Sequence, residues 1–85
     1  MNYIEKLKEE LGKEKFEEVK NSLYENSEYT HLKTGNLYYF KNIVLDVTNI
    51  TEGRLMVVYG RTGFRHPGSY CREAKEFFEK FIPRV

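Results

Sequence analysis

The sequence predicts one α+β domain over residues 1–85, with a helical N-terminal segment, a small antiparallel sheet and a short C-terminal helix. Three observations support this. The chain has only 85 residues, so it can build a single modest core. The spacing of its apolar residues changes from helical to alternating near residue 27. Its seven tyrosines and six phenylalanines argue against a disordered chain. We divide the domain into 1–26, 27–72 and 73–85.

The N-terminal segment is rich in Glu and Lys, contains no proline and spaces its apolar residues as a helix does. Gly12 lies between two apolar sets that are offset by roughly a quarter turn. We expect either two short helices, over 2–11 and about 13–25, or one helix kinked at Gly12, because a single glycine costs only about 1 kcal/mol relative to alanine. The two sets are Ile4, Leu7 and Leu11, then Phe16, Val19 and Leu23.

Residues 28–72 are dominated by β-branched and aromatic residues, and turn-forming sequences that contain glycine recur among them. This pattern predicts four short antiparallel strands, near 28–33, 37–47, 54–60 and 64–72.

The second of these strands contains a change of phase. Tyr38 and Phe40 share one face, whereas Ile43 and Leu45 have the opposite parity. The change falls at residues 41–42 and indicates a bulge or a sharp bend. A long bent strand is what closes a small barrel, so we expect a strongly bent sheet or an SH3-like half-barrel of four to five strands.

The last segment predicts a short helix. Residues 73–82 combine Glu and Lys with three phenylalanines, and Pro83 ends the pattern.

Composition argues against several classes of protein. No run approaches the roughly 18 apolar residues of a membrane span, and no secretory signal is visible. A single cysteine cannot form an internal disulfide, which is typical of a cytoplasmic protein. Two histidines and one cysteine give no zinc-site spacing, and neither a nucleotide-loop motif nor a catalytic triad is present. We therefore expect no membrane, no metal, no cofactor and no enzymatic activity.

The net charge changes sign at the same boundary, near residue 27, at which the apolar spacing changes. Residues 1–26 hold five Lys and seven Glu, a net charge of −2, and residues 27–85 carry a net charge of +3. Arginine suits a planar, two-point grip on phosphate or carboxylate, although solvated strand ends are an equally good explanation of these arginines. The window 54–72 contains no acid and holds Arg54, Arg61, Arg65 and Arg72.

The segment from Tyr29 to Tyr38 resembles the opening of the Domain of Unknown Function 1653 family, which begins with a Tyr-x-His-x-Lys-Gly pattern. Further short motifs follow in the family's order, so that the resemblance covers roughly residues 28–82. They are Thr51-Glu52, Leu55-Met56-Val57-Val58-Tyr59, Tyr70-Cys71-Arg72 and Phe77-Phe78-Glu79.

This chain departs from the family pattern at three positions. Thr34 is inserted before the glycine, Tyr70 replaces a tryptophan and Glu73 replaces a proline. The resemblance implies a compact domain with a strongly bent sheet, and it brings no established activity. It also implies that Cys71, at a position that is apolar in the family, is a half-buried and inert thiol.

We expect the candidate binding residues to line one concave surface. In the first strand Tyr29, His31 and Lys33 alternate with their neighbours and therefore share a face. An exposed strand face is the competing explanation for these three, and pairing with Glu52 is the competing role for the arginine at the end of the fourth strand. The candidate residues are His31, Lys33, Tyr38, Tyr59, Arg61 and Arg72.

Two functions fit these residues. The first is a non-catalytic binding protein for a small anionic ligand, a nucleotide or a nucleotide-derived signal. Such a protein would sequester its ligand as a homo-oligomer, in the way that small viral sponge proteins oppose host immune signalling. The alternative is a nucleic-acid- or protein-interaction module with an SH3-like or OB-like barrel. A net charge of only +1 makes nucleic acid the less favoured partner.

Overall fold

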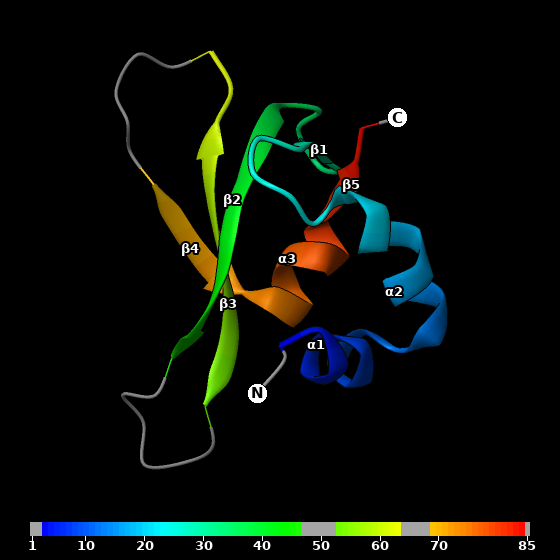
Figure 1. Ribbon diagram of the computed structural model, residues 1–85. Coiled ribbons are helices and arrows are strands. Elements are labelled where there is room, and N and C mark those ends of the chain that lie inside the picture. Colours follow the sequence, from blue (N-terminus) through cyan, green and yellow to red (C-terminus); the bar gives the residue numbers. More distant parts are fainter. Residues whose placement is uncertain (1–2, 47–52, 64–68, 85) are drawn as a thin grey trace.

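The computed structural model describes residues 3–46, 53–63 and 69–84 (Figure 1). Two N-terminal helices, α1 (Tyr3–Leu11) and α2 (Lys13–Val19), lead into a single 3-10 turn, η1 (Lys20–Ser22). Gly12 separates α1 from α2 with φ at 86°, a conformation that glycine adopts without a Cβ penalty. The break is complete, so the chain forms two helices rather than one kinked helix. The second helix is shorter than the predicted 13–25.

Five antiparallel strands form one sheet in the order β4-β3-β2-β1-β5. The sheet is open, with β4 and β5 at its two edges (Figure 1). The predicted α+β class is confirmed, and the structure shows no closed barrel among the described strands. The strands are β1 (Glu28–His31), β2 (Leu37–Asp46), β3 (Arg54–Arg61), β4 (Tyr70–Glu73) and β5 (Phe81–Pro83), and α3 (Ala74–Lys80) connects the last two.

The predicted helix over 73–82 is wrong at its end. Phe81 has φ −126° and ψ 142°, so the helix stops at Lys80 and the chain continues as β5, which pairs with β1. Pro83 fits this position because an edge strand tolerates a residue without an N–H. The ring of Phe81 still stacks on that of Phe77 at 4.4 Å, which explains why the spacing of the two phenylalanines resembles a helical pattern.

The first predicted strand is also too long. β1 ends at His31, and residues 32–34 form a turn in which the Gly35 amide donates to the His31 carbonyl. Gly35 has φ at 76°, which allows the chain to reverse there. In the fourth predicted strand, residues 64–68 lie outside the described part of the chain, and the described strand is β4.

The predicted phase change in the second strand is confirmed. The register between β2 and β3 shifts between Phe40 and Asn42, so Lys41 is an extra residue in β2. Phe40 is buried before the bulge and Ile43 is buried after it. The bulge therefore keeps apolar side chains on the same face of the sheet along the strand.

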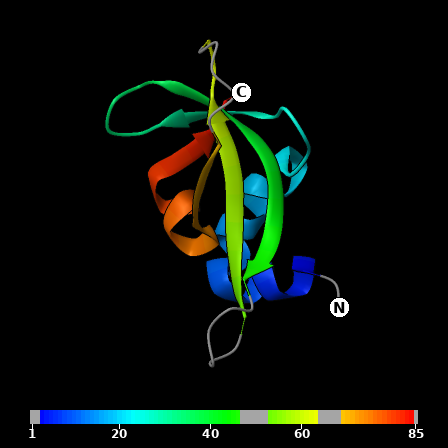
Figure 2. The same cartoon turned by 90° about the vertical axis from the view of Figure 1, so that its left-hand side faces the viewer.

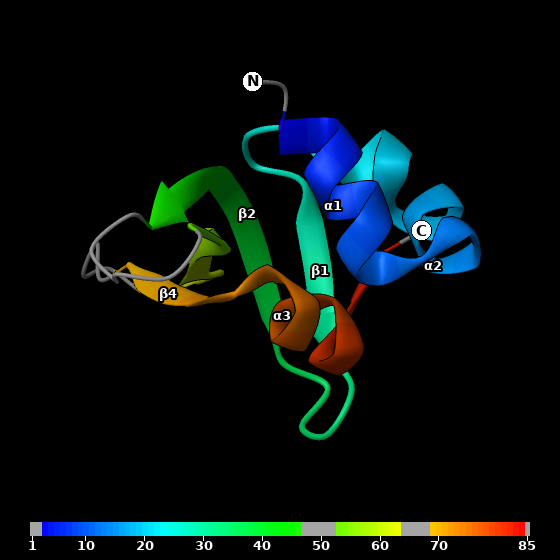
Figure 3. The ribbon, with the colours of Figure 1, turned by 90° about the horizontal axis from the view of Figure 1, so that it is seen from below.

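All three α-helices cover one face of the sheet, which we call the inner face (Figures 1 and 3). α3 packs on β3, β4 and β5, and α1 packs on both α3 and β3. In the view of Figure 2 the opposite face, the outer face, is turned to the viewer, with the helices behind it. No helix in the described ranges is long and apolar enough to span a membrane. The core between the layers contains Leu7, Val19, Tyr29, Phe40, Ile43, Leu55, Val57, Tyr59, Ala74, Phe77, Phe78 and Phe81.

Candidate functional site

Four aromatic side chains, one from each of four neighbouring strands, form a row across the inner face. The ring centroids are 6.2 Å apart from β1 to β2, 5.7 Å from β2 to β3 and 5.5 Å from β3 to β4. We call this set the aromatic row. It consists of His31 of β1, Tyr38 of β2, Tyr59 of β3 and Tyr70 of β4.

Helix α3 and strand β5 cover one side of the aromatic row. Phe77 lies 4.9 Å from the ring of Tyr59, and Phe81 lies 5.1 Å from that of Tyr38. Only 4% of Tyr59 is exposed as a result, whereas 50% of Tyr70 is exposed. Tyr59 is therefore the buried member of the row, His31 and Tyr38 are half-buried, and Tyr70 at the β4 end is the most exposed.

Arg61 lies on the same face as the row. It is the cross-strand partner of Tyr38, and it follows Tyr59 by two positions in β3. Because side chains alternate along a strand, Arg61 and Tyr59 point to one side of the sheet. The structure thus places a half-buried arginine on the face of the aromatic row.

Arg72 is already engaged within the protein. Its Nε donates to the Tyr59 hydroxyl at 3.2 Å, and its Nη1 donates to the Glu76 carboxylate at 2.6 Å. The hydrogen bond to Tyr59 and the nearby Glu76 raise the pKa of Arg72, against the effect of burial. Arg72 therefore orients Tyr59 and anchors the first turn of α3. Glu52, its partner in the competing explanation, lies outside the described residues.

Lys33 does not share a strand face with His31, contrary to the prediction. Lys33 is exposed in the turn after β1, so the alternation of a strand does not apply to it. His31 belongs to the aromatic row, and its Nδ1 lies 3.0 Å from the Thr34 hydroxyl in the same turn.

Tyr29 points to the inner face as His31 does, but it is part of the core and not of a surface. Its side chain is 0% exposed, and its ring lies 5.3 Å from that of Phe77. The hydroxyl donates to the Ser22 carbonyl at 2.7 Å. The expectation of a ligand-facing Tyr29 is wrong because α3 covers this part of β1.

Tyr70 was missing from the candidate set although it is the most exposed member of the aromatic row. Two signals for it exist in the sequence: its place in the family resemblance, where it stands for a tryptophan, and its position two residues before Arg72, which puts both side chains on one face of a strand. The next residue, Cys71, has the opposite parity and lies across from Val58 on the outer face. Cys71 is exposed, so the expectation of a half-buried thiol is wrong.

No family model, no curated protein and no solved structure matches this chain. The resemblance to the Domain of Unknown Function 1653 family stays a prediction. In the described parts of the chain, no three His, Cys, Asp or Glu side chains gather in a way that could hold a metal ion.

Proposed function

We propose that this protein binds a small anionic ligand with a planar ring, of the nucleotide class, at the exposed end of the aromatic row. The observation that carries the proposal is the half-exposed ring of Tyr70, which lies beside Tyr38 and Tyr59 on the face that also holds Arg61. A nucleobase stacked on an aromatic ring contributes about 1–3 kcal/mol of binding free energy. A charge-assisted hydrogen bond from arginine to phosphate contributes about 1.5–3 kcal/mol.

The proposed activity is sequestration without catalysis. Tyr70 begins β4, an edge strand, so a ligand stacked on its ring stays open to solvent on one side. A second copy of the chain that approaches this edge would cover the ligand, and we expect a homo-oligomer for this reason. Lys33 is exposed in the turn after β1, and we expect its positive charge to attract an anionic ligand at long range.

Single-stranded nucleic acid is the alternative ligand. A sheet face with one aromatic side chain from each of four strands also suits successive unpaired bases. The low net charge of +1 favours the small ligand over this alternative.

Native mass spectrometry of the protein purified from cells tests the proposal, because one spectrum gives both the oligomer size and any co-purified ligand. We expect a bound species with phosphate or carboxylate groups. If no ligand co-purifies, calorimetric titration with a panel of mono-, di- and cyclic nucleotides tests binding instead. The absence of both a co-purified ligand and a heat of binding with this panel would contradict the proposal.

Matched variants locate the site. Tyr70→Ala and Arg61→Ala should each weaken binding by about tenfold to a hundredfold, since every 1.4 kcal/mol changes affinity tenfold. Tyr24→Ala is the control, because Tyr24 is also exposed and lies outside the aromatic row. Arg72→Ala should mainly lower the melting temperature, because Arg72 is held by Tyr59 and Glu76.

A further inference from the structure

Strand β2 has a free edge along its second half. β1 pairs with β2 only over Leu37–Tyr39, and the last contacts on this side are the hydrogen bonds of Phe40 with Asn26 and Ser27. From residue 41 to 46, β2 pairs with β3 and with no other strand of the described chain. An unpaired strand edge is a template for the backbone of another chain.

The side-chain amide of Asn42 shows which backbone groups point to this edge. Its Oδ1 accepts the Ile43 N–H at 2.8 Å, so this N–H is directed away from β3. Successive residues of a strand direct their backbone groups to opposite edges, so the N–H and C=O of Leu45 also face the free edge. The Asn42 side chain thus pairs with one backbone donor of the free edge, the Ile43 N–H. The N–H of Leu45 is the next donor that an added strand would meet.

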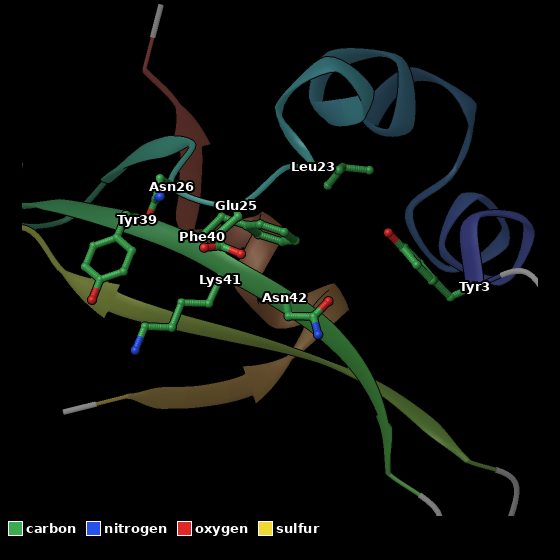
Figure 4. A pocket seen from close by; sticks show the side chains of 8 residues that line it. All are labelled: Tyr3, Leu23, Glu25, Asn26, Tyr39, Phe40, Lys41 and Asn42. Carbon is green, nitrogen blue, oxygen red and sulfur yellow. The ribbon is translucent and has the colours of Figure 1, made fainter. Parts of the chain in front are cut away.

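A groove follows the free edge, between β2 and the start of α1 (Figure 4). In Figure 4, Tyr3 and Leu23 stand on one side of it and Asn42 stands on the other. Its larger part has a volume of about 690 Å³ and has the buried Phe40 in its lining. A second, smaller hollow has a volume of about 180 Å³, and Tyr3 lines both. Lys6, Leu45 and Leu55 line the smaller hollow.

The groove exposes apolar surface where an added strand would place its side chains. Leu45 is 48% exposed and Tyr3 is 37% exposed, and both face the smaller hollow. The charged residues that line the two hollows are Lys6, Lys41 and Glu25, which carry a net charge of +1. An occupant with apolar residues at every second position and no excess of basic residues matches this lining.

We propose that the groove binds an extended peptide segment of another protein, which pairs with β2 at Ile43 and Leu45 as a sixth strand of the sheet. Main-chain hydrogen bonds supply affinity in this mode of recognition, and pockets for alternate side chains supply specificity. In the complex, a carbonyl oxygen of the peptide replaces Asn42 Oδ1 as the acceptor of the hydrogen bond from the Ile43 N–H. The site shares no lining residue with the aromatic row, so it is independent of the proposed ligand binding.

A peptide fits the groove better than a second copy of this chain. Two copies that pair along β2 in a continuous antiparallel sheet are related by a two-fold axis perpendicular to the sheet. Both inner faces then lie on the same side, and the two α1 helices meet at the seam. A lone extended segment needs only the space between β2 and Tyr3.

A phage-displayed library of random ten-residue peptides, selected against the full chain, supplies the probe. The best peptide, made synthetically, is then titrated into ¹⁵N-labelled protein. We expect the Leu45 amide, which faces the free edge, to exchange with solvent at least tenfold more slowly when the peptide is bound. The Val44 amide, which faces β3, should keep its rate and serves as the internal control.

Two variants separate strand addition from unspecific binding. Leu45→Pro removes the outward N–H while the ladder between β2 and β3 stays intact, and should weaken binding at least tenfold in a protein with unchanged circular dichroism. Asn42→Ala frees the Ile43 N–H and should strengthen binding.

Three results would overturn the proposal. The first is a selection in which no peptide is enriched more on the wild-type chain than on the Leu45→Pro variant. The second is peptide binding that does not slow exchange of the Leu45 amide, and the third is a dimer, formed without peptide, in which this amide is already protected. The last would make a second copy the occupant.

Discussion

At the scale of single residues, the hydroxyl of Tyr29 shows how a buried polar atom fixes a connection. It donates to the carbonyl of Ser22, at the end of η1, and so ties the helical segment to the first strand. A helix end leaves carbonyl groups without partners, and this bond satisfies one of them. Burial raises the pKa of Tyr29 because the tyrosinate form would be charged in the core, and the nearby Tyr24 acts in the same direction.

Tyr29→Phe should lower the free energy of unfolding by about 1 kcal/mol at neutral pH, because the Ser22 carbonyl loses its partner. The wild type should lose stability as the pH rises above about 10, since the unfolded state releases the tyrosine proton first. The variant should lose less stability over that range. Urea unfolding at pH 7 and pH 10.5 measures both effects, and an equal loss in the two proteins would contradict the role of Tyr29.

At the scale of elements, a glycine in β3 makes room for an aromatic ring of β2. Gly60 lies across from Tyr39, and a Cβ added at Gly60 would lie 2.6 Å from the Tyr39 Cζ. The ring of Tyr39 thus covers the backbone of β3 on the outer face. Lys41 lies over this ring at 5.5 Å and donates to the Ser69 hydroxyl, which connects the β2 bulge to the residue before β4.

Gly60→Ala should therefore cost about 1 kcal/mol, because the Tyr39 ring must leave its cross-strand contact. In a Tyr39→Ala background the same change should be neutral or stabilising by up to about 1 kcal/mol, since glycine weakens a strand relative to alanine. Urea unfolding of the four proteins gives the coupling energy. Equal losses in both backgrounds would show that the ring does not set the cost.

Local patterns predicted the elements whose cause is local. Gly12 predicts a break or a kink in the helical segment, and the parity of Phe40 and Ile43 predicts a bulge or a bend; the structure has the break and the bulge. The pattern does not show the end of α3, because Phe77 and Phe81 keep a helical spacing although Phe81 belongs to a strand that pairs with the distant β1.

The candidate site divides in the same way. Alternation places Tyr29 and His31 of β1 on one face, and likewise Tyr59 and Arg61 of β3, but it fails at Lys33, where β1 has already ended. It gives no information on how far α3 extends over that face, and this extent decides that Tyr29 is buried and Tyr70 is exposed. The partners of Arg72 depend on the packing of α3 on β3, which no sequence spacing shows.

At the scale of the whole molecule, the helices give the sheet one buried and one open face (Figure 2). Val57 and Val58 are neighbours in β3 and show the difference, because Val57 belongs to the core and Val58 is only half-buried on the outer face. Identical changes at these two positions therefore compare the two faces directly.

Val57→Thr should lower the free energy of unfolding by about 1–3 kcal/mol, the cost of burying a hydroxyl without a partner. Val58→Thr should lower it by less than Val57→Thr does, because Val58 is only half-buried on the outer face. Thermal unfolding followed by circular dichroism distinguishes the two, and a difference of the opposite sign would mean that the outer face is covered in solution.

The extra residue at Lys41 makes β2 unequally sensitive to the loss of one residue and of two. Replacing this lysine alters its contacts with the Tyr39 ring and the Ser69 hydroxyl. Deleting it would remove the bulge and keep every later pair with β3, because Asn42 already lies across from Val58 and would follow Phe40 in regular alternation. Deleting a second residue would shift the rest of the strand by one position and turn Ile43 and Leu45 away from the helices.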